Sequence, residues 1–280
     1  MRFFGAPRHK KSCTEFLGFD GVSFKSLLQK FAPLFDDYTP FNTSHILLKQ
    51  DPSKGGRPRK VCPEDCLGLV LVWMRTRRSL MALQLIFGLT CSNLCMYLRF
   101  GRRVIVEALK SDSLAKIAIP SNEDIMLYQE AIGAIYPLLS DVWSTMDGLK
   151  LYLQQSGNTE IQARFYNGWM HGHYVTLVFV FCPDGTIPIA FFNIPGSVHA
   201  SQVAHWGRVY NKLGAVNDET GGKCTVDSAF GKVNRPFLIK SSQDYLVSTM
   251  STRQEQRLDL QRKRQATSMR QAAEWGMRSL

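Results

Sequence analysis

The chain lacks a long hydrophobic run. Its longest apolar stretches, residues 67–74 and 175–182, are far shorter than the roughly 18 apolar residues that a membrane-spanning helix needs. After Phe3-Phe4 the N-terminal residues are basic and polar, so they do not show the apolar core of a secretory signal. From these two absences we expect no membrane partner.

Cysteine is sparse and follows no disulfide framework. The seven cysteines are an odd number in a chain of 280 residues, which favours reduced thiols in a cytosolic or nuclear protein. Two pairs, Cys62 with Cys66 and Cys91 with Cys95, have a four-residue spacing, whereas zinc sites usually have a two-residue gap. Because that spacing is typical of one buried helix face, we expect core positions. A zinc-supported nucleic-acid-binding module remains an alternative.

Acidic residues are outnumbered. The chain has 23 Asp and Glu against 34 Lys and Arg, a formal net charge of +11. The basic excess is concentrated in residues 52–110 and again from residue 251 to the end. A basic balance favours a polyanionic partner, and we expect double-stranded DNA.

A basic linker, residues 51–60, follows the N-terminal region. Its Gly56-Arg57-Pro58 core resembles an AT-hook, in which an extended Arg-Pro segment lies in a narrow minor groove. We therefore predict DNA contacts for Arg57 and Arg59. The alternatives are a solvated loop and a nuclear-import signal, and we expect a nuclear location.

Three helices are predicted after this linker. The first begins at Pro63, and the second covers residues 80–87 and ends at Gly88. Thr90 can cap the third, which runs to the region of Leu109. Two helices joined by a short turn that contains glycine form a helix-turn-helix. We assign residues 1–60 to an N-terminal segment and linker, and residues 61–120 to an all-α, helix-turn-helix-like DNA-binding region.

The third of these helices would read DNA. Ser92 and Asn93 lie in its first turn, where base contacts are usually made. Arg99, Arg102 and Arg103 share one face by their spacing and could hold phosphates. The alternative is a small helical bundle with a solvated arginine face.

Strand patterns replace helical ones after Pro120. The order of expected elements is three strands, a helix, two strands and a long helix, which is typical of a ribonuclease H-like α/β fold with a mixed sheet and flanking helices. We assign residues 141–280 to this domain. The expected strands are 142–146, 174–182, 187–194, 223–227 and 237–240, and the expected helices are 200–213 and 253–280.

Two aspartates end neighbouring predicted strands at the sheet centre. Asp147 follows the first strand and Asp227 the fourth. Two adjacent carboxylates repel each other unless they are protonated or bridged by a cation, and Mg²⁺ prefers oxygen ligands. A third carboxylate, Glu274, lies on the last helix. The alternative for each is a simple turn-forming or surface residue.

Ten short blocks of the chain, from residue 56 to residue 278, resemble those of PIF/Harbinger-like transposases, which are DDE superfamily endonucleases. In chain order they are Gly56-Arg-Pro-Arg59, Phe87-Gly-Leu-Thr90, Tyr97-Leu-Arg-Phe-Gly101, Thr145-Met-Asp-Gly148, Phe165-Tyr-Asn-Gly-Trp169, Pro183-Asp-Gly-Thr186, Pro195-Gly-Ser-Val-His199, Thr225-Val-Asp-Ser-Ala-Phe230, Pro236-Phe-Leu-Ile-Lys240 and Arg270-Gln-Ala-Ala-Glu-Trp-Gly-Met-Arg278. Several ordered blocks together are far more specific than any single one.

The resemblance implies a transposase that cuts and transfers DNA strands. Its substrates would be transposon ends and target DNA, and its cofactor a divalent metal, Mg²⁺ or Mn²⁺, with two ions in the site. Asp147, Asp227 and Glu274 would be both the catalytic residues and the metal ligands. A homo-oligomer is a further expectation, and no other cofactor is implied.

Two features depart from the family's pattern. An Asp often follows the His of the Pro-Gly-Ser block in this family, whereas here that position is Ala200. The family's last helix and a basic tail also continue well beyond the glutamate, so we expect a C-terminally truncated domain. Both features leave open an alternative function, a catalytically decayed, transposase-derived DNA-binding protein.

Overall fold

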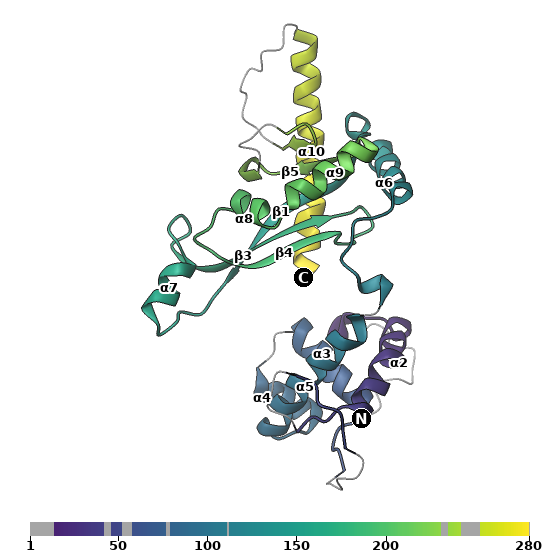
Figure 1. Cartoon of the computed structure of the whole chain (residues 1–280), viewed down its shortest axis with the longest axis vertical. Helices are drawn as coiled ribbons and strands as arrows, with labels where there is room; N and C mark the ends of the chain where they lie inside the picture. The colour runs from purple at the N-terminus through teal and green to yellow at the C-terminus, as the bar shows by residue number, and fades with distance from the viewer. Residues whose placement is uncertain are drawn as a thin grey trace. The chain divides into compact units, whose positions relative to one another are not determined.

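The computed structural model describes residues 14–41, 46–51, 58–76, 79–110, 112–230, 235–241 and 253–279. The chain forms two compact units, Met1–Lys116 and Ile117–Leu280 (Figure 1). Each unit has its own hydrophobic core.

The first unit is all-α. Its described helices are α2 (Gly21–Asp37), α3 (Pro63–Thr76), α4 (Leu80–Phe87) and α5 (Cys91–Lys110). Phe24, Phe31 and Phe35 of α2 are buried in the same core as α3 and α5. Helix α2, which lies in the stretch assigned from the sequence to an N-terminal segment and linker (residues 1–60), is therefore part of the helical core. The apolar face of α2 requires this, because three buried phenylalanines need a partner surface.

The helices α4 and α5 form the expected bent pair. The Ser79 side chain accepts a hydrogen bond from the Ala82 backbone N–H at the start of α4, and Gly88 ends that helix in a left-handed conformation, with φ of 64°. The two helix axes are bent by 93° across the short turn, within the range of helix-turn-helix motifs. No single described helix is long and apolar enough to cross a membrane, and this bent pair meets that criterion only when both helices are counted together.

The second unit is built on a mixed sheet. Its order is β4-β3-β1-β5-β6, with the short β2 paired to one end of β3. Strand β1 is antiparallel to β3 and parallel to β5, and β5 is parallel to β6. The strands are β1 (Val142–Tyr152), β2 (Tyr166–Asn167), β3 (Gly172–Phe181), β4 (Ile189–Pro195), β5 (Lys223–Val226) and β6 (Leu238–Lys240).

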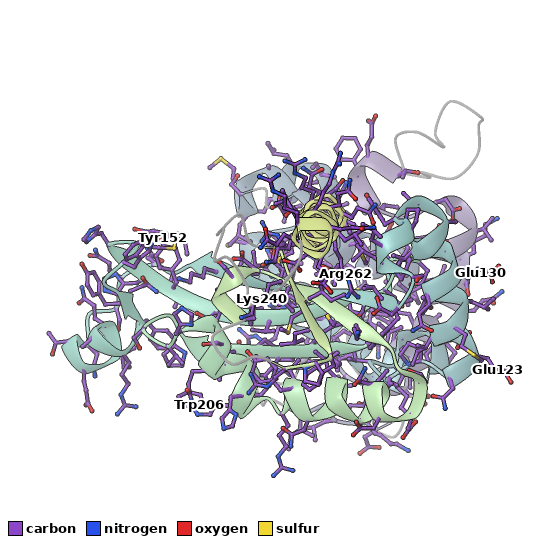
Figure 2. All side chains as sticks on the ribbon, turned by 90° about the horizontal axis from the view of Figure 1, so that it is seen from above. Glu123, Glu130, Tyr152, Trp206, Lys240 and Arg262 are labelled. Atoms are coloured by element: carbon purple, nitrogen blue, oxygen red, sulfur yellow. The ribbon has the colours of Figure 1, made fainter. Side chains whose placement is uncertain are left out.

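Helices cover both faces of this sheet. The helices α8 (Ala200–Trp206) and α9 (Val209–Thr220) pack on one face, and α10 (Arg253–Ser279) crosses the other (Figure 2). Helix α6 (Asn122–Ile135) contributes Ile125 to the first face and Ile132 to the second. This layered mixed sheet confirms the predicted ribonuclease H-like α/β fold.

Two local predictions were wrong, and two short elements were missed. The single helix expected at residues 200–213 is broken into α8 and α9, because Arg208 has φ of 52° and Gly207 lies against a ring. A Cβ on Gly207 would be 2.6 Å from Cγ of Phe191. Strand β1 continues past the expected end to Tyr152, so Asp147 lies within the strand. The short helix α7 (Thr159–Phe165) and β2 were not predicted at all.

Candidate active site

Two aspartates lie side by side at the centre of the sheet. Met146 of β1 is in register with Val226 of β5, and Asp147 and Asp227 each follow directly. The backbone N–H of Gly148 donates to Asp147 Oδ1 at 2.8 Å, and that of Ser228 donates to Asp227 Oδ1 at 2.7 Å. The strand pairing therefore sets the spacing of the two carboxylates, and the local hydrogen bonds set their orientation.

Helix α10 brings the third carboxylate to the same place. Helix α10 lies close to the sheet because the residues of its inner face are small. Ala266 and Ala273 are fully buried, and a Cβ on Gly276 would be 2.9 Å from the Phe181 ring. Glu274 follows Ala273, so its side chain projects at the margin of this contact and is half exposed, at 51%. The docking of α10 thus decides where Glu274 lies.

A three-residue brace holds α10 against the sheet. Arg262 of α10 donates from Nη2 to both oxygens of Asp141, at 2.7 and 2.6 Å, and Lys223 Nζ lies 2.9 Å from the same carboxylate. Burial alone would raise the pKa of Asp141, but the hydrogen bonds from these two cations outweigh it and hold the pKa below its usual range. The ionised Asp141 therefore links α10 to the starts of β1 and β5.

Arg270 lies among the three carboxylates. Its Nη1 is 3.9 Å from Asp147 Oδ2 and 3.7 Å from Asp227 Oδ1, and its Nη2 donates to Glu274 Oε1 at 3.3 Å. The side chains of Asp147 and Arg270 are mostly buried, at 16% and 23% exposed. The sequence-predicted triad is therefore assembled, and it is assembled around a cation that the sequence analysis did not single out. The four-residue spacing of Arg270 and Glu274 on one helix was the available signal.

The electrostatics of Asp147 reflect this crowding. Burial is the main cause that raises the pKa of its carboxyl, and the nearby Asp227 and Glu274 raise it further. The Gly148 N–H and Arg270 oppose the shift but do not cancel it. A buried carboxyl that is repelled by two others favours an added cation beside it.

The donor set fits a hard divalent cation, but its present spacing fits a guanidinium. Three carboxylates from separate elements offer the oxygen ligands that Mg²⁺ and Mn²⁺ prefer. Among the described residues, however, no group of three or more His, Cys, Asp or Glu side chains is placed to share one ion as it stands. The distances between the three carboxylates leave room for the guanidinium of Arg270, which lies within 4 Å of all three.

Ala200 lies on the opposite face of β1. A Cβ added to Gly148 would lie 3.4 Å from the Cβ of Ala200. Ala200 packs against the core formed with α8 and α9. Successive side chains of a strand point to opposite faces, so Asp147 points toward α10 while position 148 points toward α8. The three carboxylates around Arg270 are therefore assembled without position 200.

The residues predicted to contact DNA lie in the first unit. Ser92, Arg99 and Arg102 are exposed on α5, and Asn93 and Arg103 are half-buried there. Arg102 also stacks over Trp73, with its Cζ 4.8 Å from the ring centroid. The three arginines therefore form an arginine face on α5, and Arg99 and Arg102 are its exposed members.

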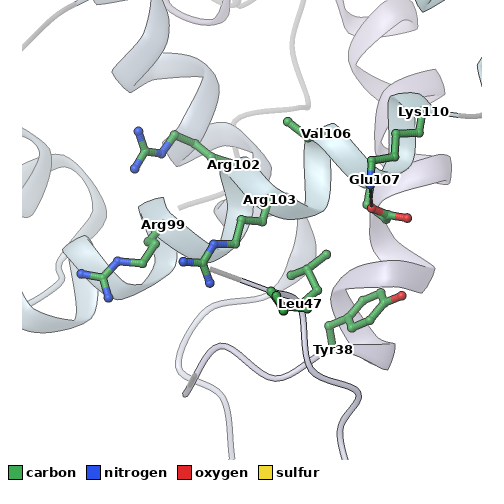
Figure 3. Close-up of a pocket in the computed structure, with 9 residues that line it drawn as sticks. Tyr38, Leu47, Arg99, Arg102, Arg103, Val106, Glu107 and Lys110 are labelled. Atoms are coloured by element: carbon green, nitrogen blue, oxygen red, sulfur yellow. Dashed lines mark hydrogen bonds and ion pairs between the residues drawn. The ribbon is translucent and has the colours of Figure 1, made fainter. Parts of the chain in front are cut away.

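A pocket of about 760 Å³ lies along this face. Figure 3 shows Arg99, Arg102 and Arg103 projecting from α5, with Tyr38 and Leu47 on the other wall. The basic side chains outnumber the single acidic one, Glu107, which is paired with Lys110 at 2.6 Å. The pocket therefore presents net positive charge over an apolar wall.

Of the two linker arginines predicted to contact DNA, the structure describes only Arg59. Arg57 lies outside the described residues. The Arg59 guanidinium is used inside the unit: it donates to the carbonyl oxygens of Phe35 and Tyr38 and to the Gln50 side chain, and it stacks 4.7 Å from the centroid of the Phe35 ring. This geometry ties the C-terminal end of α2 to the linker, and it leaves few donors for a DNA groove.

The paired cysteines do not form a zinc site in the described structure. Cys66 is fully buried, and its thiol points to the Tyr97 carbonyl oxygen at 3.7 Å. Burial raises the pKa of the Cys66 thiol well above its usual range, whereas a zinc ligand must be a thiolate. Cys62 and Cys91 are exposed. Cys66 is thus a core residue, as its helical spacing predicted, whereas the prediction of core positions was wrong for the exposed Cys62 and Cys91.

The sheet order and the helices on both of its faces define a ribonuclease H-like α/β domain. Within it, residues 146–280 match the family described as DDE superfamily endonuclease. The match supports that superfamily and, in general, an endonuclease- or transposase-type function on DNA for the second unit. No curated protein and no solved structure matches the chain.

Proposed function

We propose that the second unit is a metal-dependent DNA endonuclease that cuts and transfers DNA ends, as PIF/Harbinger-like transposases do. One observation carries this proposal: carboxylates from β1, from the end of β5 and from α10 converge within 4 Å of a single guanidinium. Three carboxylates, of which Asp147 is mostly buried, are costly to gather in one place unless a cation balances their charge.

Asp147, Asp227 and Glu274 would hold two divalent cations, Mg²⁺ or Mn²⁺. Bound ions would supply an activated water or 3′-hydroxyl and would stabilise the leaving oxygen of the phosphodiester. The chain's own contribution is positional. Strand pairing fixes the two aspartates, and the Asp141 brace fixes the helix that carries Glu274.

The test is a DNA-nicking assay on the full chain. We expect nicking of double-stranded DNA only when Mg²⁺ or Mn²⁺ is added, and we expect Asp147→Asn and Asp227→Asn each to lower the rate by about 100-fold, which corresponds to about 2.7 kcal/mol of transition-state stabilisation. Asp259→Asn is the matched control, because that α10 carboxylate pairs only with Lys263, at 2.7 Å in the described structure. Nicking that survives both triad substitutions would overturn the proposal.

The first unit is proposed to bind DNA through α5. The 93° bend after a glycine-containing turn and the arginine face support a helix-turn-helix role for Ser92, Asn93, Arg99, Arg102 and Arg103. Transposon ends and target DNA would be the ligands. A nuclear location and a homo-oligomeric state belong to the same proposal.

A second candidate function is a DNA-binding protein that has lost catalysis. Arg270 favours it, because a guanidinium already lies where metal ions would bind. The nicking assay separates the two: tight DNA binding without cutting in either metal would favour the second candidate.

A further inference from the structure

Arg270 has a role that the triad alone does not explain. We propose that Arg270 is a built-in counter-ion of the three carboxylates and that it competes with divalent cations for them. Removing its charge should therefore make metal binding tighter. The inference rests on the proposed function, since it assigns Arg270 a role at the same site.

Arg270 is the cation that lies between the three carboxylates. The guanidinium is within 4 Å of Asp147, Asp227 and Glu274 together, and it is the only Lys or Arg side chain that the described structure pairs with any of the three. A guanidinium and a divalent cation prefer the same carboxylate oxygens. Both cannot occupy one centre, because like charges at such short range repel strongly.

The guanidinium of Arg270 is held loosely at this position. Bidentate arginine–carboxylate pairs have N···O distances of about 2.7–2.9 Å. Here two of the three contacts are 3.7 and 3.9 Å, and only the contact to Glu274, at 3.3 Å, has hydrogen-bond geometry. The buried Nε of Arg270 has no hydrogen-bond partner in the described structure. A buried unsatisfied donor is costly, so this position of the guanidinium is poorly stabilised by hydrogen bonds.

The charge of Arg270 does not balance that of the three carboxylates. Three carboxylates and one guanidinium leave a net negative charge, so the site attracts further cations even with Arg270 in place. Without Arg270 the carboxylates of Asp147 and Asp227 would face each other with no described cation between them. Metal-free protein should then be less stable, and the same repulsion should be relieved by an added ion.

The side chain can leave without disturbing the helix. Arg270 lies one turn before Glu274 on α10, and its guanidinium is joined to that helix by a long, rotatable stem. The brace at Arg262 and the buried Ala266 and Ala273 hold α10 independently of it. Displacement of the guanidinium is therefore a side-chain movement only.

The experiment is a calorimetric titration of the full chain with Mn²⁺ alone, without DNA, at neutral pH. We expect Arg270→Gln to bind Mn²⁺ about tenfold more tightly than the unsubstituted protein, which corresponds to about 1.4 kcal/mol. Arg270→Lys, which keeps the charge, should remain within about threefold of the unsubstituted protein, or about 0.7 kcal/mol. Arg264→Gln is the matched control on the same helix, because it removes an exposed positive charge that is not paired with any of the three carboxylates in the described structure.

Thermal unfolding supplies the second readout. Without metal, Arg270→Gln should unfold at a lower temperature, and Mn²⁺ should raise its melting temperature by more than it raises that of the unsubstituted protein. Arg270→Met, which retains much of the apolar stem, repeats both measurements if Arg270→Gln does not fold. Mn²⁺ affinity that is equal or weaker in the charge-removing variants overturns the inference.

The proposed function is judged separately by nicking. If the protein binds Mn²⁺ more tightly after Arg270→Gln but neither form cuts DNA, the counter-ion role stands and the nuclease proposal fails. If the unsubstituted protein cuts DNA and the variant gains no Mn²⁺ affinity, the nuclease proposal stands and the counter-ion role fails.

Discussion

At the scale of single residues, the same side chain type has opposite roles in the two units. Arg59 is fixed by backbone carbonyl oxygens and two aromatic rings, whereas Arg270 has an unpartnered Nε and long contacts in the described structure. The first arrangement stabilises a fold, and the second leaves a charge available for exchange. The sequence cannot distinguish the two, because both arginines lie in basic segments and their partners come from distant positions.

Asp147 gives a prediction that separates stability from function. Burial raises the pKa of the Asp147 carboxyl, so its charged form destabilises the folded state. The contribution of the protonated Asp147 to the stability of the fold is therefore present at low pH and is lost as pH rises through the raised pKa. We expect Asp147→Asn to raise the melting temperature of metal-free protein by about 2 °C at neutral pH, while it lowers the nicking rate by about 100-fold. The gain should disappear below the usual Asp pKa range. A lower melting temperature at neutral pH would contradict this account of Asp147.

At the scale of elements, α10 is the piece that completes the site. Its small inner residues were visible in the sequence, and so was the helix itself. Its register over the sheet was not visible, since it depends on Asp141 binding Arg262 and Lys223 across the fold. The break between α8 and α9 was missed for a similar reason, because it follows from the close approach of Gly207 to the Phe191 ring.

Asp141 predicts the opposite pH dependence to Asp147. Its pKa is lowered by Arg262 and Lys223 against the effect of burial, so its contribution to stability is present above the usual Asp pKa and is lost as pH falls through the lowered value. We expect Asp141→Asn to cost about 1 kcal/mol at neutral pH, after allowance for partial exposure, and progressively less in acid. Chemical denaturation at several pH values measures this. An equal cost at every pH would exclude the ion-pair explanation.

At the scale of the whole molecule, the chain combines a helical unit that carries an arginine face with an α/β unit that carries a carboxylate centre. The strands could be predicted because strand patterns are local in the sequence, and the neighbouring aspartates could be predicted because the order of the elements is typical of a ribonuclease H-like fold. The inclusion of α2 in the first core was missed, since it depends on Phe24 and Phe31 packing against α3 and α5. The family match covers residues 146–280, so the DNA-binding role of the first unit rests on its helices and charges.

The arginine face gives a prediction on DNA binding by the full chain. If Arg99 and Arg102 hold phosphates, replacing both with Ala should weaken binding to all sequences alike and should reduce the slope of log affinity against log salt by about 2. Lys25→Ala is the control, because it removes an exposed positive charge of the same unit outside the pocket. An unchanged salt slope in the double variant would place the phosphate contacts elsewhere.

Glu274 is the member of the triad that depends on the docking of α10, so it tests the central claim most directly. The measurement is the rate of Mn²⁺-dependent nicking by the full chain with Glu274→Gln, beside Glu219→Gln, an exposed carboxylate of α9. The account predicts a loss of about 100-fold for Glu274→Gln and an unchanged rate for the control. Equal rates for both variants would show that α10 does not complete the active site.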